Sequence, residues 1–221
     1  SNPGGLAALT TKRPQFEQAA RIDVSYGSHD YKQTAFDVTG PLNDNVAYRL
    51  VGLAKDADVQ VDHVEETRYA LMPSLMLNLS DDTLLNLYAY LQHDPNGGYH
   101  GSLSASGTLH KRNGERISGS FFEGDPSVEE FTRTQQILGY ELEHRFNDTW
   151  SARQNFRYLD ASSDNSQVWG NGYVSATSNE LARGFSGGEE NLHAWIVDNM
   201  LQAEFATGAA QHTVVTGLDY Q

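Results

Sequence analysis

Residues 138–158 read LGYELEHRFNDTWSARQNFRY, two strand-like runs joined by the turn-forming pair Asn147-Asp148. In the first run apolar side chains alternate with Glu141 and Glu143, and in the second run every other residue from Ser151 to Arg157 is polar. A period of two places alternate residues on opposite faces of a β-strand. The stretch therefore predicts an antiparallel hairpin with one polar face.

The same alternation recurs along the chain and predicts nine strands and no helix. The runs lie at residues 20–26, 33–39, 46–54, 69–79, 84–92, 138–142, 150–158, 201–205 and 214–218. Alternation alone does not separate a soluble β-sandwich from a membrane barrel, because strands in both have one polar and one apolar face. The fold class is therefore all-β, and other features must decide its setting.

The composition excludes several classes of protein. The 221 residues carry 15 Lys and Arg against 29 Asp and Glu, a formal net charge of −14, and the sequence pI is about 4.8. Nucleic-acid binding needs a basic face, which this sequence lacks. Without cysteine there is no disulfide, thiolate nucleophile or cysteine-ligated zinc. No apolar run approaches the roughly 18 residues of a transmembrane helix, but barrel strands need only every second residue to be apolar.

Two kinds of connection alternate along the chain. Short connections rich in turn-forming residues lie at 41–45, 80–82, 147–148 and 207–210. Mostly longer, polar connections lie at 27–31, 56–67, 93–133 and 160–194. Outer-membrane barrels have short turns at the periplasmic end and long loops outside, whereas soluble sandwiches do not usually send every long loop to one end. The pattern predicts a transmembrane antiparallel β-barrel, with its acidic side chains in the lumen and the loops.

Several blocks of the sequence resemble those of one membrane-protein family. The opening Ser1-Asn2-Pro3-Gly4-Gly5-Leu6 and the following Thr11-Lys12-Arg13-Pro14 resemble the end of the plug domain in TonB-dependent siderophore receptors. The resemblance continues, in the family's order, through residues 35–42, 47–54, 139–150, 201–208 and 212–220. It is closest to the ferric-hydroxamate type, similar to the ferrichrome and ferrioxamine receptors.

The resemblance implies that the chain is part of a larger receptor. Such receptors close 22 strands around a plug, so about nine strands would be the N-terminal part of the barrel. We expect residues 1–14 to be the end of the plug domain and the linker, and residues 15–221 to be barrel. The implied location is the bacterial outer membrane, in contact with its lipid and lipopolysaccharide.

The same resemblance implies where a ligand binds. Residues 96–103 and 167–173 correspond to places where hydroxamate receptors put aromatic contacts to a ferric siderophore. The candidate contacts are Tyr99, His100, Ser102, Trp169, Asn171 and Tyr173. The family often has aromatic residues at the positions of His100, Ser102 and Asn171, so we expect an altered or more polar ligand. The alternative is that the aromatic residues only order long loops.

The implied function is TonB-dependent uptake of a ferric siderophore, and not catalysis. The iron arrives already chelated, so we expect neither a protein metal site nor a cofactor. The eight histidines are scattered, and the sequence has no phosphate-binding loop and no Gly-x-Ser-x-Gly motif. The TonB–ExbB–ExbD complex would supply energy through an N-terminal region that this sequence does not contain. Two other hypotheses stay open: a passive porin-like or small outer-membrane barrel, and a soluble β-sheet carbohydrate-binding domain.

Overall fold

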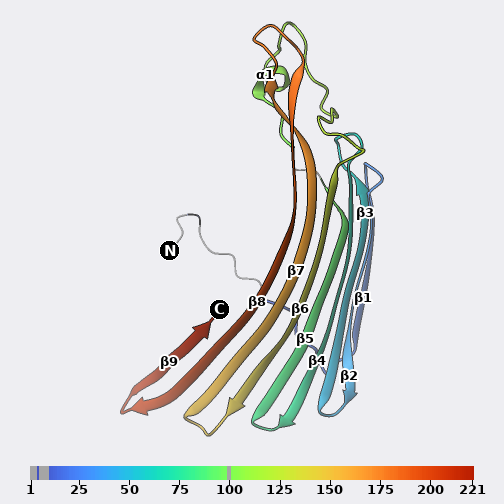
Figure 1. Cartoon of the computed structure of the whole chain (residues 1–221). Helices are drawn as coiled ribbons and strands as arrows, with labels where there is room; N and C mark the ends of the chain where they lie inside the picture. Colours follow the sequence, from blue (N-terminus) through green and yellow to red (C-terminus); the bar gives the residue numbers. More distant parts are fainter. Residues whose placement is uncertain (1–3, 5–9, 99–100) are drawn as a thin grey trace.

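The computed structural model describes residues 4, 10–98 and 101–221, and its strands form one antiparallel sheet (Figure 1). The strands are β1 (Ala19–Tyr26), β2 (Lys32–Asn43), β3 (Val46–Asp58), β4 (Glu65–Ser80), β5 (Thr83–Gly97), β6 (Glu130–Arg145), β7 (Trp150–Tyr173), β8 (Leu181–Thr207) and β9 (Ala210–Tyr220). They follow one another across the sheet in sequence order. Within the described residues the sheet is not closed, and β1 and β9 are its edges. The prediction of nine antiparallel strands is confirmed.

The hairpin of residues 138–158 forms at the expected turn. β6 and β7 pair from Glu130 opposite Ser166 to Arg145 opposite Ser151. The Asn147 side chain accepts hydrogen bonds from the backbone N–H groups of Thr149 (2.9 Å) and Trp150 (3.0 Å). Asparagine is favoured in turns because its side chain can bond to backbone groups nearby. The turn chemistry in the sequence therefore fixes the register of the hairpin.

The structure corrects the expected connection at residues 160–194. Most of it is strand, because β7 continues to Tyr173 and β8 already begins at Leu181. Residues 159–168 are paired with residues 185–194 across the two strands. Stretches such as Ser162-Ser163-Asp164-Asn165 are polar on both faces. A two-sided polar strand gives no alternation, so its sequence looks like a loop.

The expectation that the chain has no helix is wrong, because the structure has one short helix. α1 (Ala105–Thr108) is a four-residue turn of helix, and Ser106 and Gly107 inside it have non-helical backbone angles. Four residues are too few to show a helical period in the sequence. No helix among the described residues is long and apolar enough to cross a membrane.

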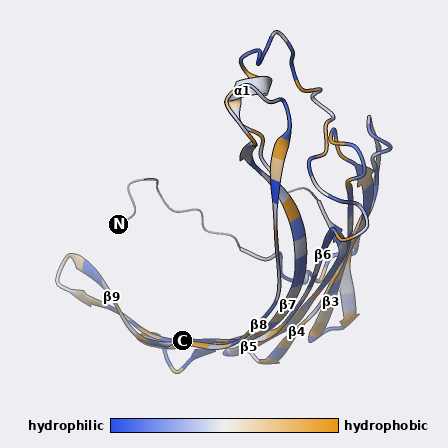
Figure 2. Ribbon diagram, turned by 45° about the horizontal axis from the view of Figure 1, so that its top comes forward, coloured by the Kyte–Doolittle hydropathy of each residue, from blue (hydrophilic) through white to orange (hydrophobic). Residues whose placement is uncertain are grey.

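The two faces of the sheet have opposite chemistry, with alternating hydropathy along the strands (Figure 2). Large apolar side chains on the outer face are exposed: Ile22, Val24, Tyr69, Leu71, Leu75, Leu87, Leu91, Leu138, Trp195, Leu201, Val214 and Leu218. Polar side chains are buried on the inner face: Thr39, Arg49, Ser74, Asn86, Gln92 and Asp94. A soluble sheet would bury its apolar face, whereas a barrel turns that face to lipid and keeps a polar lumen.

Candidate functional site

The long connections gather at one end of the sheet, which we call the loop end (Figure 1). The connections there follow β1, β3, β5 and β7, and those at the opposite end, the turn end, follow β2, β4, β6 and β8. Four of the six predicted ligand contacts, Ser102, Trp169, Asn171 and Tyr173, belong to the loop-end connections or to the strand ends beside them. Tyr99 and His100 lie outside the described residues.

Trp169 lies on the inner face of β7 near the loop end. The strand runs without irregularity from Ser151 to Gly170, so Trp169 shares a face with Arg153, which forms an ion pair with Glu143 on the inner face (3.4 Å). Its indole covers Gly184, the residue opposite it on β8. The ring is half-buried. The site therefore offers one flat aromatic surface toward the interior.

The remaining predicted contacts do not share that arrangement. Ser102 and Asn171 are exposed. The pairing register shifts between Gly170 and Tyr173, and Tyr173 is turned to the long loop of residues 101–129. Its hydroxyl donates a hydrogen bond to the carbonyl oxygen of Ser106 (2.7 Å). Tyr173 therefore contacts this loop, and its role as a ligand contact stays a prediction.

Gly107 makes room for this contact. Its φ is +97°, in the region that favours glycine, and a Cβ atom there would overlap the Tyr173 hydroxyl. The loop therefore approaches Tyr173 at a point where only glycine fits.

Arg112 is a residue that the sequence analysis missed. Its guanidinium carbon lies 3.7 Å from the centre of the Tyr173 ring, and its nitrogen atoms donate to backbone carbonyls of the connection between β7 and β8. Asn113-Gly114, with φ values of +49° and +85°, forms the tight turn beside it. An Asn-Gly pair is a hairpin signal in a sequence, so the turn could have been predicted. The segment that Arg112 and Asn113 contact, 63 to 66 residues further along the chain, could not have been predicted.

A hollow of about 320 Å³ lies next to Trp169's strand at the loop end. Its lining includes His63, Glu65, Asn96, Phe131 and Gln167. Larger hollows exist, and the one of about 660 Å³ lies at the turn end. A smaller hollow of about 250 Å³ at the loop end is lined by Tyr173, Arg112 and Asn179. The 320 Å³ hollow is lined by Gln167, which lies two residues before Trp169 on the same face of β7, and by none of the described predicted contacts themselves.

Residues 122–129 close the side of this hollow. Glu129 accepts a hydrogen bond from the backbone N–H of Val168 (2.8 Å), and Arg183 donates to the carbonyl oxygen of Gly124 (2.9 Å). Asp125 accepts hydrogen bonds from the hydroxyl (2.7 Å) and the backbone N–H (3.0 Å) of Ser127. These bonds hold the pKa of Asp125 below its ordinary value. Side chains thus fasten this loop to the upper part of β7 and β8.

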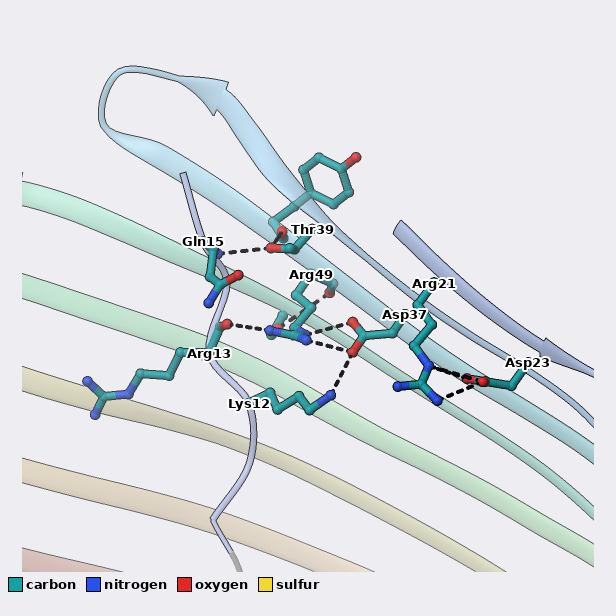
Figure 3. Close-up of polar contacts among 10 residues, drawn as sticks. Lys12, Arg13, Gln15, Arg21, Asp23, Asp37, Thr39 and Arg49 are labelled. Carbon is teal, nitrogen blue, oxygen red and sulfur yellow. Dashed lines mark hydrogen bonds and ion pairs between the residues drawn. The ribbon is translucent and has the colours of Figure 1, made fainter. Parts of the chain in front are cut away.

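The segment before β1 is fastened to the inner face of the sheet (Figure 3). Lys12 and Arg49 both form ion pairs with Asp37, at 3.0 and 2.6 Å. Arg49 also donates to the carbonyl oxygen of Arg13 (3.0 Å), and the backbone N–H of Gln15 donates to Thr39 (2.9 Å). The segment is therefore held by an ion pair of the Lys12 side chain and by hydrogen bonds of its backbone at Arg13 and Gln15.

Arg13 extends the attachment to a strand far along the chain. Its Nη2 lies 2.7 Å from a carboxylate oxygen of both Glu141 and Glu143 on β6. Burial alone would lower the pKa of Arg13, but the hydrogen bond to Glu143 and the charges of both glutamates raise it. The prediction that acidic residues such as Glu141 stand on a polar inner face is consistent with these contacts.

A second charged cluster on the inner face lies closer to the loop end. Asp94 is 1% exposed and pairs with Arg68 (2.8 Å) and Arg133 (2.7 Å). Gln92 also donates to it (2.8 Å). The cluster ties β4, β5 and β6 together. Among the described residues, no group of His, Asp or Glu side chains could hold a metal ion.

A meander with an apolar outer face, a charged inner face, long loops at one end and tight turns at the other is part of the wall of an outer-membrane β-barrel. No family model matches the chain. Over its whole length the chain is 43% identical to the ferrioxamine B receptor of Salmonella typhimurium and 34% identical to the ferrichrome outer membrane transporter/phage receptor of Escherichia coli. Over its whole length the chain is thus similar to part of the TonB-dependent siderophore receptors of the ferrioxamine and ferrichrome type.

Solved structures show the same fold. The Escherichia coli ferric-catecholate import receptor Fiu superposes with a TM-score of 0.81 over 95% of this chain, at 19% identity. The ferripyoverdine receptor of Pseudomonas aeruginosa gives a TM-score of 0.81 over 93% of this chain, at 23% identity. The chain spans about a third of the length of the curated relatives, 32% in both cases named above. The location predicted from the sequence, the outer membrane, agrees with these relatives.

Proposed function

We propose that the protein to which this chain belongs takes up a ferric siderophore, of hydroxamate type, across the outer membrane. The observation that carries the proposal is the relationship over the full chain to receptors for ferrioxamine and ferrichrome. The relatives favour this function over a passive porin and over a soluble carbohydrate-binding domain, the two other hypotheses from the sequence.

The ligand would bind at the loop end, against Trp169. An aromatic face suits the organic shell of a siderophore, and a concave site with a few polar groups suits its orientation. The hollow beside β7 supplies polar groups from Asn96 and Gln167. Ser102 and Asn171 are exposed at the same end and would add hydrogen bonds. Tyr99 and His100 stay predictions.

The iron would be cargo. A siderophore surrounds the metal with its own oxygen atoms, so the receptor needs no metal ligands and no cofactor for this task. The relatives are receptors and transporters, and we propose no catalytic step. Energy would come from the TonB–ExbB–ExbD complex through a plug and an N-terminal region outside this chain, and the outer face would contact lipid and lipopolysaccharide.

The test uses the full-length receptor in its native membrane. Binding and uptake of iron-55-loaded ferrioxamine B and ferrichrome would be measured for wild type, Trp169→Ala, Tyr99→Ala and Trp150→Ala. Losing an aromatic contact would raise Kd about five- to tenfold for the first two variants. Trp150 at the turn end is the matched control and should bind as wild type does. Wild-type affinity in both Trp169→Ala and Tyr99→Ala would remove the proposed site.

A further inference from the structure

Arg112 holds the connection between β7 and β8 by its backbone. Nη2 donates to the carbonyl oxygens of Ser175 (2.7 Å) and Ala176 (3.0 Å). Nε donates to the carbonyl oxygen of Ser178 (2.9 Å), and the guanidinium lies over the Tyr173 ring. A planar guanidinium has five donors in a fixed fork and stacks on aromatic faces, whereas lysine is a point charge with three donors. The contact is therefore specific to arginine.

The neighbours of Arg112 complete the junction. Asn113 donates to the carbonyl oxygen of Thr177 (3.0 Å) and to the side-chain oxygen of Asn179 (2.8 Å). Asn179 donates in turn to Glu115 (3.1 Å). The backbone carbonyls of residues 175–178 thus all accept hydrogen bonds from Arg112 and Asn113. We call this set of contacts the 112–179 junction.

The strand segment that carries Trp169 has a neighbouring strand on one side only. β6 pairs with β7 only as far as Ser166, so residues 167–173 have a neighbouring strand on one side alone, which is β8. On the open side, the Glu129 carboxylate bonds to Val168. Strand edges without a partner move more than paired ones, because fewer backbone hydrogen bonds hold them. Arg183, opposite Gly170, donates to the carbonyl oxygen of Gly124 (2.9 Å), and the 112–179 junction is the attachment beyond it at the tip of the hairpin.

We propose that Arg112 is a positioning residue of the ligand site. By joining the loop of residues 101–129 to the tip of the β7–β8 hairpin, it presents Ser102 and Trp169 to the ligand as one rigid unit. The proposal rests on the proposed siderophore function. Nε and Nη2 of Arg112 donate to protein carbonyls, and Nη1 lies 3.5 Å from the Ser106 hydroxyl. We therefore assign Arg112 a role through the position of other residues and no contact with the ligand.

The affinity test uses Arg112→Lys and Arg112→Gln in the full-length receptor, with Arg116→Gln as a control for the loss of one exposed positive charge nearby. Kd for iron-55-loaded ferrioxamine B and ferrichrome should rise about tenfold in both Arg112 variants, because an unattached loop must be ordered on binding. Arg116→Gln should leave Kd unchanged. A lysine that restores wild-type affinity would overturn the proposal, since charge alone would then suffice.

A second readout reports position directly. This chain has no cysteine. In a full-length receptor freed of any other cysteine, spin labels at Leu109→Cys and Val174→Cys, both on exposed side chains, report the distance between loop and hairpin. The distance distribution should be narrow in the parent and broad in Arg112→Gln. Joining Asn113→Cys to Asn179→Cys with a short thiol crosslinker should restore the affinity of Arg112→Gln.

The outcomes separate the two proposals. If the Arg112 variants bind normally while Trp169→Ala loses affinity, the positioning role is wrong and the siderophore function stands. If the distances broaden and affinity falls, with rescue by the crosslink, the positioning role is confirmed. If the wild-type receptor binds neither ferrioxamine B nor ferrichrome, the siderophore function fails and the positioning role falls with it.

Discussion

The Nη2 atom of Arg13 lies 2.7 Å from Oε1 of Glu143, so a residue that precedes the first strand is bound to the sixth. Glu141 shares the same nitrogen at 2.7 Å. The segment of residues 12–15 therefore crosses the inner face from β2 to β6 (Figure 3). Motion of the segment requires these charges to separate.

Replacing Arg13 with glutamine should loosen this segment. Hydrogen exchange at the Gln15 amide, which donates to Thr39, should rise about three- to tenfold in the full-length receptor, because a half-exposed ion pair contributes about 1 kcal/mol. Lys12→Gln is the matched control, since Lys12 is 70% exposed and should change exchange less. Equal exchange in wild type and Arg13→Gln would contradict the role of Arg13.

Asp94→Asn should destabilise the barrel wall. The new amide would keep the shape of the side chain but leave Arg68 and Arg133 facing each other without the shared carboxylate, at a cost of about 2–4 kcal/mol. Urea unfolding of the full-length receptor in lipid vesicles measures this. Asp148→Asn, in an exposed turn, should stay within about 0.5 kcal/mol of wild type. A comparable loss in both variants would show that the cluster has no special role.

Gly184→Ala should displace the ring of Trp169. A Cβ atom at Gly184 would lie 3.0 Å from Cζ2 of the indole, so the ring must shift. The fluorine resonance of 5-fluorotryptophan at position 169 should move, and affinity for ferrioxamine B should fall about three- to tenfold. Gly188→Ala, four residues along the same face with nothing within 4 Å, should change neither. If the fluorine resonance moved in Gly188→Ala but not in Gly184→Ala, the packing of Trp169 over Gly184 would be refuted.

Leu138→Arg should weaken folding into vesicles more than Ile137→Arg. Leu138 is 54% exposed on the outer face, whereas Ile137 is its neighbour on the inner face. A charge on the lipid face costs up to about 4 kcal/mol, depending on depth, and a lumen position costs far less. The reverse order of the two variants would mean that the faces have been assigned the wrong way round.

Most of the fold could be predicted from the sequence because each strand carries its own signal. Strands such as β4 and β5 alternate leucines with polar residues, and the Asn147-Asp148 turn marks its hairpin. The upper halves of β7 and β8 carry no such signal, since water on both faces removes the apolar period. Their strand structure comes from pairing with each other, which is a long-range property.

The candidate site was predicted less well. Resemblance pointed to Trp169 and Tyr173, and the structure places them differently: Trp169 faces inward, and Tyr173 contacts a loop. Their roles as ligand contacts stay predictions. Arg112 could not be found, because its function depends on carbonyl groups of residues distant in sequence. The boundary between plug and barrel at residues 14 and 15 stays a prediction, with β1 beginning at Ala19.

The length of β7 has a consequence for where capture takes place. From Trp150 to Trp169 the strand spans about 60 Å at roughly 3.3 Å per residue, and a tilt of about 40° leaves some 45–50 Å along the membrane normal. The hydrocarbon layer is only about 30 Å thick. The indole that we assign to the ligand therefore stands well beyond the lipid tails, at the level of the sugars on the cell surface. A siderophore would meet the receptor while still in the medium, before it reaches the barrier it has to cross.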